Sequence, residues 1–114
     1  MSKVTPFAAR IEGVTEFETV ARLDELEPGS LACARVGDED VALARIGDEV
    51  YALQGHCIHL QGPLCEGRLD GHVLSCPWHG WQYDVRTGEN EFDRAIKLET
   101  YPVQIEDGEV KVAI

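Results

Sequence analysis

Two short motifs in the middle of the chain each combine a thiol with an imidazole. The first is C-x-H at Cys57 and His59, and the second is C-x-x-H at Cys76 and His79, with sixteen residues from Leu60 to Ser75 between them. Thiolate and imidazole together are a ligand set for soft to borderline metals. In an extended C-x-H segment the two side chains lie on the same side, and a tight turn brings the C-x-x-H pair together. The spacing therefore predicts two loops that hold one inorganic centre from opposite sides.

The two motifs and the residues around them resemble the Rieske iron–sulfur family. Further agreement lies at Leu64, at Gly67 and in the run His79-Gly80-Trp81-Gln82-Tyr83-Asp84. The resemblance implies one [2Fe-2S] cluster with two cysteine and two histidine ligands, a set that raises the reduction potential above that of an all-cysteine cluster. It implies that Cys57 and Cys76 hold the inner iron, and that His59 and His79 hold the outer iron, which is the one reduced.

A structural zinc site is the main alternative for this ligand set, since zinc also takes two Cys and two His. Zinc modules usually pair C-x₂₋₄-C with H-x₃₋₅-H, however, and do not place one Cys and one His in each motif. A chance coincidence of four unrelated residues is the other alternative. The pattern favours the iron–sulfur cluster over both.

The segments that must position these ligands alternate like strands. They are separated by turns rich in Gly and Asp, which is typical of an antiparallel sandwich or barrel. The chain of 114 residues is the size of one domain. We expect an all-β fold with a Rieske-like base, a cluster-binding subdomain inserted at about residues 55–90, and an N-terminal lead-in at 1–16. The strand-like segments are 17–23, 31–36, 41–46, 50–54, 81–85, 95–98, 101–105 and 110–114.

Two aromatic residues after the second motif are candidates for tuning the cluster. The resemblance implies that the Tyr83 hydroxyl donates a hydrogen bond to a cysteine ligand, which raises the potential. Trp81 stands where high-potential relatives have a serine, and it cannot supply the same donor. Those relatives also carry a disulfide between the cluster loops, at positions that are Gly62 and Trp78 here. The resemblance therefore implies the low-potential branch, although the third loop, Phe92 to Ala95, lacks the proline usual in the family.

The two other cysteines need a separate account. Cys33 alternates within a strand-like segment, and we expect a small side chain in the core. Cys65 lies within the first cluster loop and has no partner cysteine in the second. We interpret it as an unbonded thiol; a bond to Cys33 is disfavoured but left open.

The histidine-bearing end of the cluster is the expected docking surface. A small, nearly uncharged patch is predicted there, of the size that weak electron-transfer encounters use. Its members are Leu60, Gln61, Gly62, Pro63 and Trp78. His56 and His72 lie beside turns, and we expect both to be surface histidines.

The formal net charge of −11 narrows the possible partners. Nucleic acid requires Lys and Arg, so we expect no nucleic-acid binding. Acidity suits an electron carrier steered to a basic partner, although it also serves solubility alone. No apolar run is long enough to cross a membrane, and the N-terminus lacks a signal-peptide pattern. We expect a soluble, cytoplasmic monomer.

The resemblance implies a ferredoxin that is no enzyme by itself. We expect a one-electron carrier between a flavin-containing reductase and the terminal oxygenase of a ring-hydroxylating dioxygenase system. The alternative is the small subunit of an NAD(P)H-dependent nitrite reductase, which has a similar size and fold.

Overall fold

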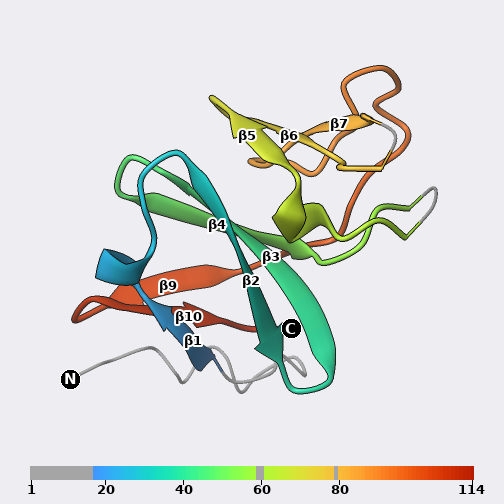
Figure 1. Cartoon of the computed structure of the whole chain (residues 1–114). Helices are drawn as coiled ribbons and strands as arrows, with labels where there is room; N and C mark the ends of the chain where they lie inside the picture. The colour runs from blue at the N-terminus through green and yellow to red at the C-terminus, as the bar shows by residue number, and fades with distance from the viewer. Residues whose placement is uncertain (1–16, 59–60, 79) are drawn as a thin grey trace.

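The structure is a computed structural model that describes residues 17–58, 61–78 and 80–114. This part of the chain forms antiparallel strands and two short 3₁₀ turns (Figure 1). The expectation of an all-β fold is confirmed. The elements are β1 (Glu18–Arg22), η1 (Leu23–Glu25), β2 (Ser30–Val36), β3 (Glu39–Ile46), β4 (Glu49–Gln54), η2 (Leu64–Glu66), β5 (Arg68–Asp70), β6 (Val73–Ser75), β7 (Gln82–Asp84), β8 (Thr100–Tyr101), β9 (Val103–Glu106) and β10 (Glu109–Val112).

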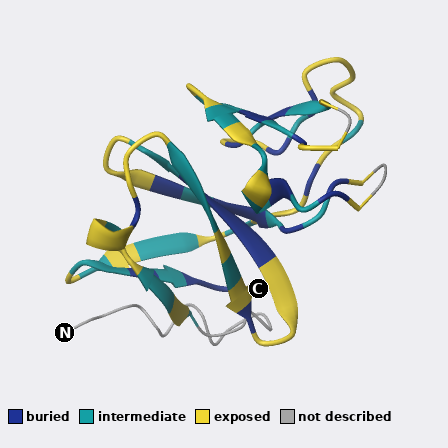
Figure 2. Cartoon of the chain, viewed as in Figure 1, coloured by how far each residue is buried: buried dark blue, intermediate teal, exposed yellow. Residues whose placement is uncertain are grey.

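Two sheets form the base of the molecule. One has the strand order β2-β3-β4-β8 and the other β1-β10-β9. Strand β3 lies between two cores. Four successive residues, 41–44, are buried, so both faces of the strand are covered (Figure 2). Val41 and Leu43 face the core between the two base sheets, whereas Ala42 and Ala44 face a second core beneath the cluster loops. A strand buried on both faces is expected to be continuously apolar, as this one is.

A third, smaller sheet, β5-β6-β7, lies at one end of the molecule (Figure 1). The second ligand motif lies between β6 and β7, and the first lies between β4 of the base and η2. The second core joins this third sheet to the base through Leu53 of β4 and Leu74 of β6, both fully buried. The alanines of β3 leave room on this side for larger side chains such as Leu64 and Tyr83. The packing thus places the cluster loops directly on the central strands of the base.

Most of the predicted strands are present, and the differences have local causes. Strands β5 and β6 were missed because each has three residues and lies inside the segment interpreted as a loop. The segment 95–98 is wrong as a strand, since it makes only an isolated bridge between Glu89 and Lys97. Pro102 divides the predicted strand 101–105 into β8 and β9, because proline has no N–H to donate to a ladder. Within the described residues, no helix has the length and apolar character needed to cross a bilayer.

Candidate metal centre

The two predicted ligand motifs open two loops that close with the same backbone hydrogen bonds. We call residues 57–62 the first cluster loop and residues 76–81 the second cluster loop. In the first, Cys57 N–H donates to Gly62 O (2.8 Å), and Gln61 N–H donates to Cys57 O (2.9 Å). In the second, Cys76 N–H donates to Trp81 O (2.8 Å), and Gly80 N–H donates to Cys76 O (3.0 Å). Each cysteine is therefore held by its own backbone before any metal ligation.

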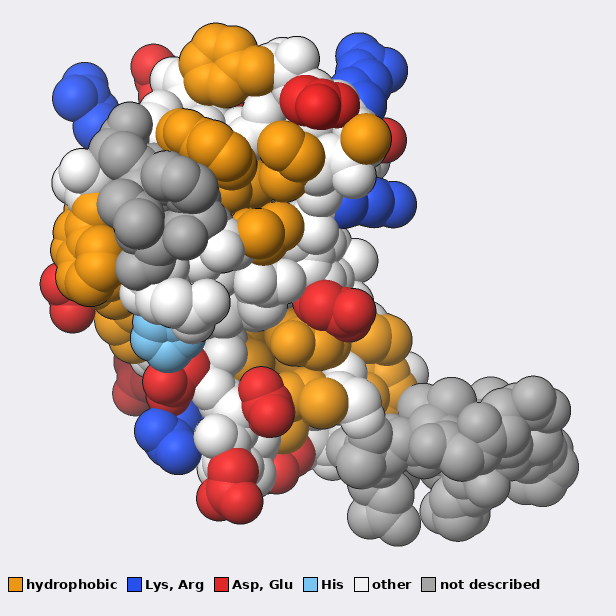
Figure 3. Space-filling model, turned by 90° about the vertical axis from the view of Figure 1, so that its right-hand side faces the viewer, with side chains coloured by type: hydrophobic (Ala, Val, Ile, Leu, Met, Phe, Trp, Pro, Cys, Tyr) orange, Lys and Arg blue, Asp and Glu red, His pale blue; other side chains and the backbone are white. Residues whose placement is uncertain are grey.

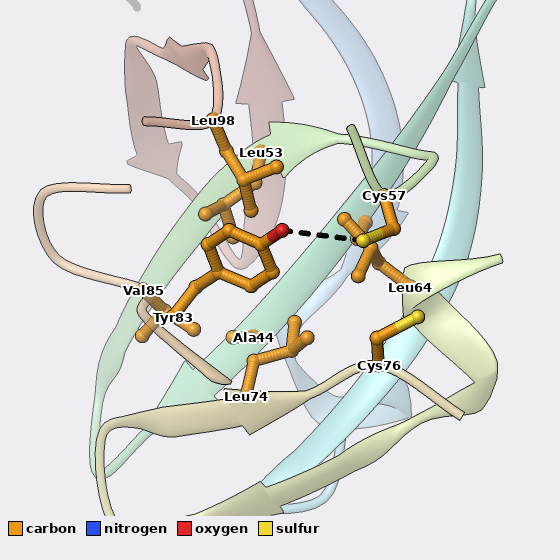
Figure 4. Packing of buried hydrophobic residues seen from close by; sticks show 10 residues of the cluster. Ala44, Leu53, Cys57, Leu64, Leu74, Cys76, Tyr83, Val85 and Leu98 are labelled. Atoms are coloured by element: carbon orange, nitrogen blue, oxygen red, sulfur yellow. Dashed lines mark hydrogen bonds between the residues drawn. The ribbon is translucent and has the colours of Figure 1, made fainter. Parts of the chain in front are cut away.

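Both loop cysteines are buried in the second core, which also contains Tyr83. Cys57 is 0% exposed and Cys76 is 3% exposed, and neither takes part in the disulfide described below. The Tyr83 hydroxyl oxygen lies 3.2 Å from Cys57 Sγ, and Figure 4 shows it directed at that sulfur. With Cys57 as a thiolate ligand, the phenol is the donor. The expected contact between Tyr83 and a cysteine ligand is thus present.

Tyr83 is fixed by packing and stays protonated. Its ring is fully buried among Leu53, Leu74, Val85 and Leu98 (Figure 4). Burial, followed by the hydrogen bond with Cys57, raises the pKa of Tyr83 far above its ordinary value. The phenol therefore keeps its proton at neutral pH and can donate it to sulfur.

Gly62 of the first loop lies against the sulfur of Cys76, and it leaves the space beside that sulfur open because it has no side chain. A Cβ added at Gly62 would lie 2.8 Å from Cys76 Sγ and 3.2 Å from Trp78 Cγ. The two loops therefore approach each other at the Cys76 sulfur, where no side chain fits. Two buried sulfurs on facing loops, one with a phenol donor, are a donor set that fits the inner end of a [2Fe-2S] cluster.

His59 and His79, together with Leu60 of the predicted patch, lie outside the described residues. Within the described ranges, no three His, Cys, Asp or Glu side chains gather into a metal site. The assignment of His59 and His79 as ligands of the outer iron therefore rests on the sequence motif.

The predicted docking patch is only partly a surface. Gln61 and Trp78 are exposed, the latter to 61%, and Pro63 is half-buried, but Gly62 is buried under Trp78 and offers no surface. Figure 3 shows hydrophobic side chains gathered at this end of the molecule. Two exposed apolar residues outside the expected patch are Ile58 (42%) and Phe92 (76%).

The interpretation of the other two cysteines is wrong. Cys33 of β2 and Cys65 of η2 form a disulfide, with their Cα atoms 5.0 Å apart. Cys33 is exposed and not a core residue, and Cys65 is half-buried and not an unbonded thiol. Strand alternation predicted the wrong face for Cys33, because Ala32 and Ala34 pack toward the core of the base instead. The bond connects the base to the cluster-binding end and leaves the two cluster loops without a disulfide between them.

The structure also describes Trp81 and the two expected surface histidines, His56 and His72. Trp81 packs against the second core, so its packing role is present. His56 and His72 have side chains 43% and 45% exposed. His56 Nε2 lies 3.8 Å from Asp40 Oδ2, and His72 Nε2 lies 3.9 Å from Asp84 Oδ2.

One buried polar residue was missed by the sequence reasoning. Asn90 is 2% exposed, in the segment that follows β7, and it pairs with Tyr83 in an isolated bridge. Its Oδ1 accepts from the N–H groups of Phe92 (2.8 Å) and Asp93 (3.0 Å). In sequence it stands among charged residues, and only the turn preference of asparagine hinted at its role.

Comparison with known proteins agrees with this geometry. Residues 16–102 match the model of the Rieske [2Fe-2S] domain. The chain is 36% identical over 96 residues to Ferredoxin CarAc of Metapseudomonas resinovorans, covering 82% of this chain and 90% of that protein. It matches a solved chain from a complex of reduced oxygenase and oxidized ferredoxin in carbazole 1,9a-dioxygenase with a TM-score of 0.78 and 35% identity, covering 85% of this chain and 92% of the other.

A third likeness concerns the fold alone. A putative NADH-dependent nitrite reductase small subunit from Mycobacterium tuberculosis gives a TM-score of 0.80 at 20% identity, covering 88% of this chain and 96% of that one. The family match spans residues 16–102, which include the two buried cysteines and Tyr83. The chain therefore belongs to the Rieske [2Fe-2S] family and is an electron carrier of the ferredoxin type.

Proposed function

We propose that this protein passes single electrons from a flavin-containing reductase to a terminal oxygenase of a ring-hydroxylating dioxygenase system. The observation that carries the proposal is the pair of buried cysteines on facing loops at an end of the molecule whose surface is apolar. The relatives named as ferredoxins of oxygenase systems support it. In this role the chain is the electron-transfer component, and the substrate is transformed elsewhere.

The ligand assignment is part of the proposal. Cys57 and Cys76 would hold the inner iron, and His59 and His79 the outer iron. When bound, a [2Fe-2S] cluster supplies a site that takes up and releases one electron. The protein's own contribution is to bury the two cysteine sulfurs, to donate the Tyr83 hydrogen bond to Cys57, and to expose the apolar side chains of Ile58 and Trp78 in the same two loops.

The docking surface of the proposal is centred on Trp78. Its side chain is the largest exposed apolar group of the second cluster loop, and Gln61 and Pro63 lie in or next to the first. Leu60 remains a proposed member. The net charge of −11 provides long-range attraction to a basic partner. A short-range apolar contact within a charged periphery permits fast binding and fast release, which a carrier between two partners needs.

The proposal extends to the oligomeric state and location of the protein. A monomer in the cytoplasm suits a carrier that must meet two different proteins. We also propose that residues 1–114 make one domain with its cluster-binding subdomain at about 55–90. Strand β3, buried on both faces and shared by both cores, supports this arrangement.

The direct test is reconstitution followed by spectroscopy and electron transfer. Anaerobic reconstitution should give two irons and two acid-labile sulfides per chain, and the reduced protein should show the paramagnetic resonance signal of a mixed Cys/His cluster. Replacing His59 or His79 by Cys should change that signal toward the all-cysteine type. Reduction by a flavoprotein reductase and reoxidation by a dioxygenase oxygenase complete the test. A colourless protein that binds zinc would overturn the proposal.

A nitrite reductase subunit remains the alternative function. The likeness to such a subunit is one of fold, at 20% identity, and it favours neither function. Permanent co-purification with a large sirohaem protein would support it, whereas turnover with several separate acceptors supports the free carrier.

A further inference from the structure

The disulfide between Cys33 and Cys65 fastens the cluster-binding end to the base. Cys33 lies in β2, and Cys65 lies in η2, which begins directly after Pro63 at the end of the first cluster loop. Leu64, the residue directly before Cys65, is fully buried in the core that also holds Cys57 and Cys76. Opening the bond therefore removes the one disulfide cross-link, among the described residues, that adds to the main chain in joining the base to the segment after the first loop.

The bond is open to attack from solvent. Cys33 is exposed and Cys65 is half-buried, and both line a hollow of about 250 Å³ with Asp40, His56, Pro63 and Glu66. A structural disulfide is typically shielded, and proteins of reducing compartments seldom keep one. Exposed disulfides are the labile ones, which regulate or exchange.

We propose that Cys33–Cys65 is a thiol-exchange site that takes a dithiol as its reductant and controls how firmly the protein retains its cluster. The retention part rests on the proposed ligand assignment, whereas the exchange chemistry does not. The carboxylates of Asp40 and Glu66 in the hollow disfavour negatively charged attackers such as glutathione. An uncharged dithiol, or a dithiol protein with a basic rim, fits this lining better.

The exchange balances in two steps. One thiolate of the dithiol attacks the exposed Cys33 sulfur, the protein S–S bond breaks, and Cys65 leaves as a thiolate that takes up a proton. The second thiol of the dithiol then attacks the mixed disulfide, and Cys33 leaves in the same way. Two electrons and two protons have passed to the protein, and the dithiol departs as a disulfide. Oxidation of the two thiols by a disulfide reverses the sequence.

The experiment uses the native, cluster-loaded protein under anaerobic conditions. Dithiothreitol without denaturant should make two cysteines reactive to N-ethylmaleimide, identified as Cys33 and Cys65 by mass spectrometry, and glutathione at equal thiolate concentration should act more slowly. An iron chelator should then bleach the opened protein about tenfold faster than the closed one, since a cross-link of this loop length contributes strongly to stability. Labelling of Cys33 and Cys65 before the reductant is added, or only in denaturant, would refute an accessible disulfide. Equal rates with dithiothreitol and glutathione would refute the preference for an uncharged dithiol. Equal bleaching rates of the opened and closed protein would refute the control of cluster retention.

Matched variants separate the bond from its side chains. Cys33→Ser, Cys65→Ser and the double variant should all bleach like the opened wild type and should no longer respond to dithiol. If only the variants at Cys65 bleach quickly, packing of that side chain is responsible and the proposal fails. The apoprotein provides a readout without the cluster: its unfolding midpoint should fall by roughly 10 °C on opening. If reduction opens the disulfide and lowers the unfolding midpoint but the protein never binds a cluster, the proposed function is refuted and the exchange site is not.

A separate observation concerns the buried side-chain amide of Asn90, which lies next to Tyr83. Its Nδ2 is buried and makes no hydrogen bond to any described residue. A buried N–H without an acceptor is costly, so it should turn to the nearest group that can accept. Asn90 pairs with Tyr83 across an isolated antiparallel bridge, and directly paired residues carry their side chains on the same face of the ladder.

We infer that Asn90 is a positioning residue whose Nδ2–H donates to the Tyr83 oxygen and so aims the Tyr83 proton at Cys57. A donor on the phenol oxygen also strengthens the phenol's own donation, because successive hydrogen bonds polarise one another. The inference rests on the proposed ligand role of Cys57.

A double-mutant cycle on the reduction potential tests the route. Asn90→Ser keeps an oxygen for the turn at Phe92 but cannot reach Tyr83, and should lower the potential. In a Tyr83→Phe background the same change should have no effect. An equal shift in both backgrounds, or none in the wild type, would refute the inference. In the diamagnetic apoprotein, the Asn90 side-chain amide protons should exchange slowly with solvent and faster in Tyr83→Phe, a readout that survives if no cluster binds.

Discussion

The first and second cluster loops have the same backbone and differ in the side chains attached to it. In each, the cysteine carbonyl accepts from the N–H four residues later, and the cysteine N–H donates to the carbonyl five residues later. In each, the fourth residue after the cysteine is left-handed, Gln61 with φ 61° and Gly80 with φ 77°. The closure that would present a sulfur to the proposed cluster is therefore a property of the backbone, and the side-chain contacts differ between the two loops.

The side-chain contacts of the two loops differ most clearly at the fifth residue after each cysteine. In the first loop it is Gly62, which must be small because the Cys76 sulfur of the other loop lies against it. In the second loop it is Trp81, whose side chain packs on the core beneath. Only the first loop is closed over the partner loop's sulfur, so equivalent substitutions should have unequal effects in the two loops.

The largest effect is expected for Gly62→Ala. The new Cβ would lie 2.8 Å from Cys76 Sγ, a sulfur that can rotate away in the apoprotein but is fixed when it holds iron. We expect most of the cluster content to be lost, as iron and acid-labile sulfide analysis would show, with apoprotein stability lowered by no more than about 1 kcal/mol. Gln61→Ala, next to it and exposed, is the matched control and should retain the cluster. Normal cluster content in Gly62→Ala would mean that the loops are not closed at Cys76.

The next effect concerns the phenol of Tyr83 in β7, which contacts the cysteine of the first loop. Tyr83→Phe removes the 3.2 Å contact with Cys57 Sγ without altering the packing of the ring. The reduction potential should fall, because a hydrogen bond to a sulfur ligand stabilises the added electron. Apoprotein stability should fall by about 1 kcal/mol. Tyr51→Phe, at a tyrosine bonded to Glu49 at the surface, is the control and should leave the potential unchanged. A potential unchanged in Tyr83→Phe would remove the phenol from the tuning of the cluster.

What could be predicted from the sequence follows the same division between backbone closure and long-range contact. The all-β fold was predicted because strand alternation and Gly/Asp turns carry it. The contact of Tyr83 with a cysteine of the motifs was implied by the resemblance to the Rieske family, and the ligand role of the four Cys and His residues stays a prediction. The disulfide was left open but disfavoured, because Cys33 and Cys65 are 32 residues apart and no local rule joins a strand to a distant 3₁₀ turn. Asn90 was missed for a related reason: its burial depends on a loop folding back onto Tyr83, which leaves no periodic signal.

A smaller effect is expected in the second loop at its left-handed position. A Cβ at Gly80 would meet nothing within 4 Å, so Gly80→Ala tests backbone strain without a clash. Placing a Cβ at a φ of 77° should destabilise the apoprotein by about 1 kcal/mol. Urea unfolding with an unchanged m-value is the measurement. A loss well above that amount would show that the loop cannot close as described.

The smallest effect, and the one with the opposite sign, is expected at the equivalent position of the first loop. Gln61 already occupies the left-handed region at φ 61°, and its side chain is exposed. Gln61→Gly relieves that strain but gives the unfolded chain more freedom, so the net gain should be only about 0.5 kcal/mol. The same urea titration measures it against Gly80→Ala. If Gln61→Gly instead destabilises the protein, the Gln61 side chain must hold the loop by a contact, and the common backbone would not suffice to close both loops. If it stabilises the protein but slows electron transfer to the oxygenase, the glutamine is retained for docking at a cost in stability.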